Sequence, residues 1–321
     1  MILFTADWHI KLGQKNVPVA WARNRYKSFF DQVRLIESRP DLHLHIIGGD
    51  IFDRLPTMEE LELYFSFIRG VQIPTIIYDG NHEATKKNKT FFTQLKEASK
   101  YVNPLITIID TSYTDSQFKF NILPYADLHK DNSIELFDMS MPLFTHVRAE
   151  IPPHVKPEIE LSRLEKFPIV FSGDLHSHSN TQKNIVYPGS PMTTSFHRNK
   201  VETGYLLIDE STWQWKWEAF ELPQLLRKTV TSVDEMIAST YDHTIYELEG
   251  DIQNLAGVKN SELLDKKVIK RSNEASLVID KDMTIAEELS EYLLYILEIP
   301  EENISTILGT FNDYSQKAQM E

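Results

Sequence analysis

Short apolar runs rich in β-branched residues alternate along the first part of the chain with longer stretches of helical periodicity. Six runs are typical of buried strands that end in polar residues: 1–5, 42–47, 73–78, 105–109, 142–145 and 169–172. Apolar residues between the first two runs share one helix face, and Thr57 with Glu60 supplies a capping box for a helix between the second and third. This alternation predicts a largely parallel, layered α/β sheet.

The pattern changes after about residue 220. Residues 214–220 alternate tryptophans with polar residues, as a half-exposed antiparallel strand does, and we expect further strands at 244–248, 267–270 and 276–279 and a helix over 285–297. The expected domains are 1–222, a small α/β cap over 223–299 and a helical tail over 300–321. Apolar residues at helical spacing in the tail (Ile304, Ile307, Leu308, Phe311 and Tyr314) either pack on their own domain or offer a docking face to a partner.

The composition is that of an ordinary soluble globular protein, with 41% hydrophobic and 25% charged residues in 321. No apolar run approaches the ~20 residues of a membrane span, and the first residues lack the features of a signal peptide. The chain has no cysteine, which excludes disulfides and thiolate metal sites and fits a reducing cytoplasm. A metal site must therefore use His, Asp, Glu and Asn, which suits Mn²⁺, Mg²⁺ or Fe²⁺ better than structural zinc.

The net charge of −14 argues against a surface that binds nucleic acid throughout. An enzyme with this charge that acts on DNA needs positive charge near its substrate, either from divalent cations at the active site or from a basic partner subunit.

Metal-capable side chains follow five of the predicted strands, at the point where each strand ends. They are Asp7 and His9, Asp50 and Asp53, Asn81 and His82, His146, and the group Asp174, His176 and His178. Because loops at the carboxyl ends of such strands meet at one edge of the sheet, we expect these side chains to gather there. A single aspartate at a strand end is more often a helix or turn cap, but five such ends in this order indicate a functional site.

The chemistry that suits such a cluster is attack on a phosphate ester. A phosphodiester resists nucleophiles because its own negative charge repels them. Two divalent cations roughly 3.5–4 Å apart neutralise that charge, polarise the phosphoryl group and generate hydroxide at neutral pH. One carboxylate must bridge the cations, and glycines beside the predicted ligands (Gly48, Gly49 and Gly80) permit the tight turns that such a site requires.

Four sequence blocks resemble those of a known family: 7–9, 49–53 and 80–83 resemble the motifs of the calcineurin-like metallophosphoesterases, and 187–191 resembles a segment of their SbcD-type nuclease subunits. The resemblance covers about residues 1–220, and the short chain is similar to bacteriophage versions. It implies a layered metallophosphoesterase sandwich with a cap, and two bound metal ions, with Mn²⁺ favoured and Mg²⁺ as the alternative.

The resemblance also implies a metal ligand set. Asp7 and His9 would bind one ion, Asp50 would bridge to the second, and Asn81 with His146 would belong to that second ion. These assignments are expectations carried over from matching positions in the motifs.

The remaining positions are less uniform. His82 would protonate the leaving sugar oxygen or steady the transition state, and the Asp53 carboxylate, if it approaches His82, would favour the protonated imidazole. Asp174 stands where the family usually has the first histidine of a Gly-His-x-His block. The distance to the block at 187–191 favours Asp174 and His176 as ligands, while His176 and His178 are the alternative.

The resemblance implies a metal-dependent DNA exonuclease and endonuclease subunit that acts with an SbcC-type coiled-coil ATPase in recombination, repair or replication. The family precedent is a homodimer in a larger assembly, located in the cytoplasm, or in the host cytoplasm for a phage protein. One rival is a phosphomonoesterase or small-molecule phosphodiesterase, which the block at 187–191 and the cap disfavour. Another is a non-catalytic scaffold, which the presence of Asp50, Asn81 and His82 disfavours.

Overall fold

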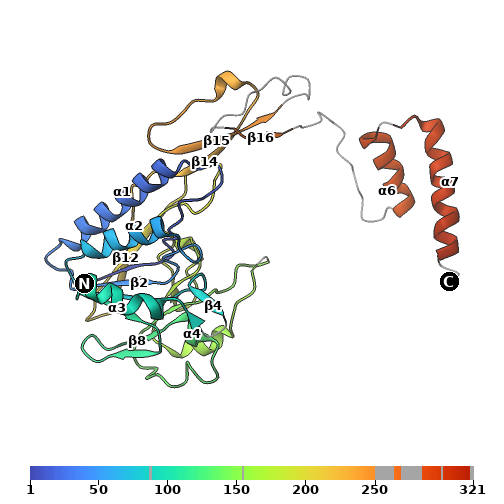
Figure 1. Cartoon of the computed structure of the whole chain (residues 1–321). Coiled ribbons are helices and arrows are strands. Elements are labelled where there is room, and N and C mark those ends of the chain that lie inside the picture. Colours follow the sequence, from blue (N-terminus) through green and yellow to red (C-terminus); the bar gives the residue numbers. More distant parts are fainter. Residues whose placement is uncertain (87–88, 154, 250–263, 269–283, 298, 319–321) are drawn as a thin grey trace. The chain divides into compact units, whose positions relative to one another are not determined.

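The computed structural model describes residues 1–86, 89–153, 155–249, 264–268, 284–297 and 299–318 (Figure 1). The chain divides into two compact units, Met1–Glu247 with Lys259–Lys266, and Leu248–Val258 with Lys267–Glu321. All of the candidate site residues belong to the first unit. The domain boundary expected at residue 222 stays a prediction.

The first unit contains a sheet of six strands in the order β13-β12-β1-β2-β3-β6. Four of them are parallel: β1 (Ile2–Thr5), β2 (Leu44–Gly48), β3 (Thr75–Tyr78) and β6 (Ile106–Ile109). β12 (Gly204–Ile208) pairs antiparallel with β1, and β13 (Trp215–Ala219) pairs antiparallel with β12. The four parallel strands and the antiparallel tryptophan strand are therefore confirmed.

A second sheet has five strands in the order β11-β10-β9-β8-β7. Its strands are β11 (Ile185–Val186), β10 (Val170–Gly173), β9 (Leu143–His146), β8 (Phe120–Leu123) and β7 (Tyr113–Asp115), of which only β7 pairs antiparallel with its neighbour. The strands predicted at 142–145 and 169–172 exist, but they lie in this second layer. The first sheet is apolar on both faces, so each face needs a covering layer.

Aromatic side chains join the two sheets. The ring of Phe4 on β1 lies edge-on to Phe144 of β9 and Phe171 of β10, with centroids 5.3 and 6.2 Å apart. The other face of the first sheet is covered by three helices: α1 (Val19–Glu37), α2 (Met58–Arg69) and α3 (Phe92–Val102). Figure 1 shows α1 and α2 beside β12 and β2. The sandwich therefore has a helical layer, a six-stranded sheet and a five-stranded sheet.

The predicted start of α2 is confirmed. Thr57 Oγ1 accepts the backbone N–H of Glu60 at 3.3 Å, and the Glu60 carboxylate accepts the backbone N–H of Thr57 at 2.8 Å. The first unit also contains short elements: the hairpin of β4 (Ala84–Lys86) and β5 (Lys89–Thr90), the helix α4 (Tyr125–Leu128), and the 3₁₀ turns η1 (Leu161–Lys166), η2 (His178–Asn180) and η3 (Val233–Glu235).

A third sheet follows β13, with the order β14 (Leu225–Val230), β15 (His243–Glu249) and β16 (Leu264–Val268). The strand expected at 244–248 is thus confirmed. The strand expected at 267–270 begins earlier, at Leu264, and the strand expected at 276–279 lies outside the described residues.

The second unit contains α6 (Ile285–Glu291), the π-helical turn η4 (Tyr292–Ile296) and α7 (Glu301–Ala318), and α6 and α7 contact each other. The helix expected over 285–297 therefore changes to π geometry after Glu291, and α7 occupies the described part of the predicted tail. Within the tail, Ile304 is buried and Ile307 is 37% exposed. Among the helices that the structure describes, none combines the length and the apolar character needed to cross a membrane.

Candidate metal centre

Five strands from two sheets deliver the candidate side chains. β1 leads to Asp7 and His9, β2 to Asp50, β3 to Asn81 and His82, β9 ends in His146, and β10 leads to Asp174 and His176. The first three strands belong to the six-stranded sheet and the other two to the five-stranded sheet. The carboxyl ends of both sheets therefore meet at one place, and the layered sandwich that the resemblance implied is confirmed.

The backbone is strained where these side chains gather. Four of the candidate ligands are in the left-handed region, with φ of 57° at Asp7, 45° at His9, 51° at Asp50 and 96° at Asp174. Such conformations cost of order 1–3 kcal/mol each outside glycine and cluster at functional sites, and Asp, Asn and His adopt them most readily. The surrounding sandwich must therefore impose this geometry.

Backbone hydrogen bonds tie the loops after β1 and β2 together. The N–H of Asp7 donates to the carbonyl of Gly49 at 3.1 Å, and the N–H of His9 donates to the carbonyl of Asp50 at 2.9 Å. Gly49 has a φ of 84°, and a Cβ there would lie 2.6 Å from Nδ1 of His146. Only glycine fits this position, which explains why it precedes Asp50.

One cluster of polar groups forms around His146. Its Nδ1 lies 2.9 Å from the carbonyl oxygen of Gly48, so Nδ1 donates to that carbonyl and Nε2 is the ring nitrogen directed into the centre. That Nε2 lies 3.0 Å from the side-chain amide of Asn81 and 3.4 Å from Oδ2 of Asp50. An imidazole nitrogen, a side-chain amide and a carboxylate oxygen therefore converge, and all three are groups that can bind a divalent cation.

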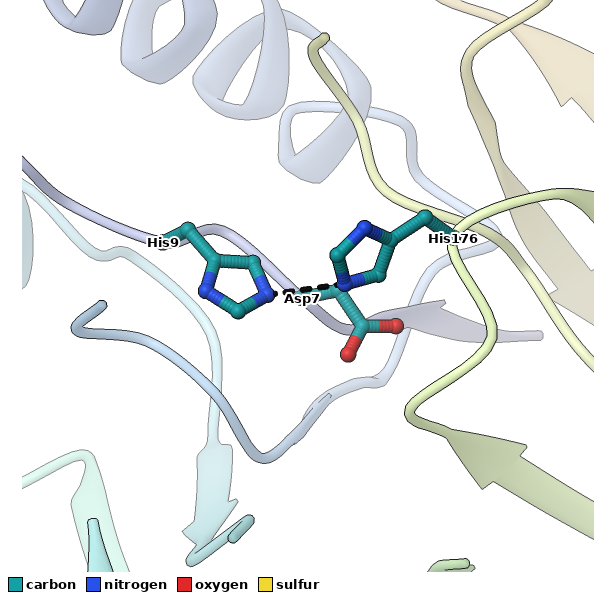
Figure 2. Close-up of side chains that lie close together, drawn as sticks. All are labelled: Asp7, His9 and His176. Carbon is teal, nitrogen blue, oxygen red and sulfur yellow. Dashed lines mark hydrogen bonds between the residues drawn. The ribbon is translucent and has the colours of Figure 1, made fainter. Parts of the chain in front are cut away.

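A second cluster lies beside it (Figure 2). Nε2 of His9 is 3.0 Å from Nε2 of His176, and Asp7 offers a carboxylate oxygen within 4.8 Å of both rings. The two facing nitrogens can share at most one proton, whereas a cation would accept both lone pairs. Nε2 of His9 also lies 3.6 Å from Oδ2 of Asp50, which places the Asp50 carboxylate between the two clusters.

The electrostatics of the centre also call for added positive charge. Burial lowers the pKa of His9 to about 3 and raises the pKa of Asp7 to about 8. Burial likewise opposes a proton on His146, but the Asp50 and Asp7 carboxylates raise its pKa well above the ordinary value. Carboxylate, amide and imidazole groups that converge in this way fit hard divalent cations such as Mn²⁺ and Mg²⁺.

His82 sits at the open side of the centre. Its backbone N–H donates to Oδ1 of Asp50 at 2.9 Å, and its ring lies edge-on to His9 with centroids 4.7 Å apart. Nδ1 of His82 donates to the backbone carbonyl of Asp53 at 2.5 Å. The Asp53 carboxylate itself pairs with Lys11 at 2.7 Å and lies 3.8 Å from Nδ1 of His9, and no ion pair between this carboxylate and His82 is present among the described residues. Nε2 of His82 is thus the nitrogen left to exchange a proton.

The structure separates the two alternatives after β10. His176 lies against His9 in the second cluster, and Oδ1 of Asp174 lies 3.9 Å from Nε2 of His146. The ring of His178 instead stacks on Trp217, with centroids 5.4 Å apart, and its Nδ1 donates to a backbone carbonyl. This placement favours Asp174 and His176 over His178 as ligands.

Glu83 is a residue whose role the sequence reasoning missed. It is fully buried, and its carboxylate accepts the backbone N–H groups of Asp50, Phe52 and Gly80, each at 2.9 Å. It therefore fixes the loops after β2 and β3 relative to each other. The available signal was an acidic residue directly after the Asn81–His82 pair.

Replacing Glu83 by glutamine should lower the free energy of unfolding by about 1–3 kcal/mol, because an amide N–H₂ must then face a buried backbone donor. Mn²⁺ affinity should fall with it, since the Asp50 loop loses its support. Urea unfolding with and without Mn²⁺ measures both effects. The matched control is Glu62→Gln on the exposed face of α2, and equal unfolding free energies for the two variants would contradict the assigned role.

A cavity of about 660 Å³ adjoins the centre. Asp174 and His176 form part of its wall, and most other polar lining groups are hydroxyls: Ser177, Ser179, Ser190, Thr193, Thr194, Ser195 and Thr203. Neutral hydroxyl donors of this kind contact sugar and phosphate oxygens in nucleic-acid complexes. The cavity therefore offers room for part of a substrate beside the clusters.

Comparison with known proteins shows which family and which proteins this chain is similar to. A family model described as calcineurin-like phosphoesterase matches residues 1–148. The chain is 38% identical over 322 residues to the "Probable exonuclease subunit 1" of Escherichia phage T5, covering 98% of each protein. It is 28% identical over 225 residues to the "Putative phosphoesterase 244L" of Invertebrate iridescent virus 6, covering 64% of this chain and 75% of that protein. A solved archaeal phosphodiesterase aligns with a TM-score of 0.39 at 14% identity, over 68% of this chain and 99% of the other.

Proposed function

Because the chain belongs to the calcineurin-like phosphoesterases, we propose that it is a metal-dependent deoxyribonuclease subunit that hydrolyses phosphodiester bonds. The observation that carries the proposal is the convergence of carboxylate, imidazole and amide groups on two neighbouring points, with Asp50 between them. A centre of that kind suits an anionic ester that water attacks too slowly on its own.

The proposed ligands follow from the two clusters. Asp7, His9 and His176 would hold one cation, Asn81, His146 and Asp174 would hold the other, and Asp50 would be shared between the two groups. When bound, the two cations supply charge neutralisation, polarisation of the phosphoryl group and activation of water. Mn²⁺ is the proposed ion and Mg²⁺ the alternative, since all ligand atoms are carboxylate or amide oxygens or imidazole nitrogens.

The protein itself supplies the proton and the alignment. His82 presents Nε2 at the open side of the centre, while its Nδ1–H is held by the carbonyl of Asp53. A proton on Nε2 can pass to the sugar oxygen as the bond to phosphorus breaks. Lys11, close to the centre through its pair with Asp53, would contact a neighbouring phosphate, and the catalytic part proposed for Asp53 is to orient both groups.

DNA is the proposed substrate and an SbcC-type ATPase the proposed partner, in recombination, repair or replication in the host cytoplasm. The phage T5 relative is described as an exonuclease subunit, which supports both a nucleic-acid substrate and a partner chain. The sequence has no GxxxxGK[ST] block, so ATP binding would fall to that partner. The exposed Ile307 of α7 suits a docking helix, and the proposed assembly contains two copies of the chain.

The proposal is tested by incubating the purified chain with linear duplex DNA, and separately with p-nitrophenyl phosphate and bis(p-nitrophenyl) phosphate. We expect Mn²⁺-dependent DNA degradation that stops when EDTA is added and that increases with the ATPase subunit. Hydrolysis of the monoester with intact DNA would replace the proposal with a phosphomonoesterase. Absence of Mn²⁺ binding and of all hydrolysis would identify a scaffold.

A further inference from the structure

Arg148 lies two residues after the candidate ligand His146, at the end of β9. Its Nε is 3.4 Å from Oδ2 of Asp174, and the side chain is 42% exposed. Among the residues that the structure describes, Asp174 is the carboxylate in ion-pair range of this guanidinium. Nε is itself buried without a hydrogen bond, so its orientation follows from the charge of Asp174.

The main chain of Arg148 is held from the other side by Glu158. The N–H of Glu158 donates to the carbonyl of Arg148 at 3.0 Å, and the N–H of Arg148 donates to the Glu158 carboxylate at 3.4 Å. The same carboxylate accepts the hydroxyl of Tyr125 at 2.6 Å and lies 3.2 Å from Nε2 of His129. The backbone of Arg148 is therefore held by Glu158, and its guanidinium contacts Asp174.

Asp174 needs a partner because it adds a carboxylate to a centre that already contains two. Its backbone N–H donates to Oδ1 of Asp7 at 3.0 Å, so the two acidic residues are drawn together. Oδ2 of Asp174 faces Arg148, while Oδ1 lies toward Nε2 of His146. The guanidinium thus pairs with one carboxylate oxygen, while the other oxygen points into the cluster around His146.

We propose that Arg148 is a positioning residue that holds the Asp174 carboxylate in place as a metal ligand, so that the two residues act as a pair. This inference rests on the proposed function, because a ligand role for Asp174 is part of it. Outer partners that orient a ligand typically change metal affinity by 10–100-fold when they are removed. A pair with a half-exposed arginine contributes little to folding stability, so the effect should appear in metal binding and not in thermal unfolding.

The experiment is a Mn²⁺ titration of the full chain by calorimetry, with thermal unfolding of the metal-free protein in parallel. The variants are Arg148→Gln, Arg148→Lys, Asp174→Asn and the double change R148Q/D174N. Arg163→Gln is the control, because Arg163 pairs with Glu135 at 2.7 Å in a surface ion pair outside the centre. We expect R148Q to weaken the weaker Mn²⁺ site about 10–100-fold, R148K to recover part of it, and R163Q to change nothing.

The double variant separates positioning from a general structural role. If Arg148 acts through Asp174, R148Q should cost several-fold less affinity in the D174N background than in the wild type. An equal loss in both backgrounds, or an R148Q affinity within about threefold of wild type, overturns the inference and leaves the proposed function standing. If D174N alone abolishes the weaker site, a higher Mn²⁺ affinity in R148K than in R148Q supports the inference, and equal affinities in the two variants overturn it. A wild-type chain that binds no Mn²⁺ overturns the proposed function itself.

Discussion

Replacing His82 by alanine should reduce the rate of DNA cleavage by about 10²–10⁴-fold while Mn²⁺ affinity stays within a few-fold of wild type. Nε2 of His82 is available for proton transfer because Nδ1 is committed to the carbonyl of Asp53 at 2.5 Å. Loss of this group removes the proton that the departing sugar oxygen requires. Single-turnover cleavage of a labelled duplex under saturating Mn²⁺ measures the effect on the chemical step.

The Mn²⁺ titration is essential, because His9, Asp50 and His82 also lie close enough to form a ligand set of their own. A variant that loses both cleavage and Mn²⁺ binding would make His82 a ligand and not a proton donor. The matched control is His43→Ala: this histidine is exposed and lies 3.0 Å from Glu210, at the other end of the sheet from the site. Unchanged cleavage by the His82 variant would remove the residue from the mechanism.

Replacing Asp50 by asparagine should reduce the rate of DNA cleavage by a similar factor, for a different reason. Its carboxylate lies 3.6 Å from Nε2 of His9 and 3.4 Å from Nε2 of His146, so loss of its charge should weaken both proposed metal positions. Two-metal stabilisation of a phosphoryl transition state is worth several kcal/mol, and about 4 kcal/mol corresponds to roughly a thousandfold in rate. We expect a loss of that order.

Elemental analysis after gel filtration gives the metal content of this variant directly. We expect about two Mn²⁺ per wild-type chain and less than about one per D50N chain. Asparagine tolerates the left-handed backbone and can still accept the N–H of His82, so the loop should keep its shape. Asp31→Asn on the exposed face of α1 is the matched control, and a D50N chain that retains two Mn²⁺ would exclude Asp50 as the shared ligand.

The strands could be predicted because each is a short apolar run bounded by polar residues, and the capping box at Thr57 is a purely local signal. The same runs could not reveal that β9 and β10 belong to a separate sheet. That division depends on which apolar faces meet, such as Phe4 against Phe144, and such contacts are long-range. The strand pattern therefore indicated a common edge without assigning each strand to a layer, although the family resemblance implied a layered sandwich.

Within the candidate centre, sequence order predicted which residues would gather, because strand ends fix the position of the residues directly after them. It did not predict which contacts the other side chains in these loops make. The Asp53 carboxylate turns to Lys11, and Glu83 turns inward to three backbone donors. Histidines within a strand were equally ambiguous: His43 is exposed, whereas His45 is fully buried between Glu37 and Thr5.

The left-handed backbone at Asp7, His9, Asp50 and Asp174 bears on how these positions respond to random mutation. Side chains that adopt this conformation most readily after glycine are Asp, Asn and His, and these are also donors for hard divalent cations. A library randomised at the four codons and sorted only for a folded chain, with no metal present, should already be enriched in coordinating residues. Selection for folding and selection for catalysis would then favour the same few residue types at these four positions.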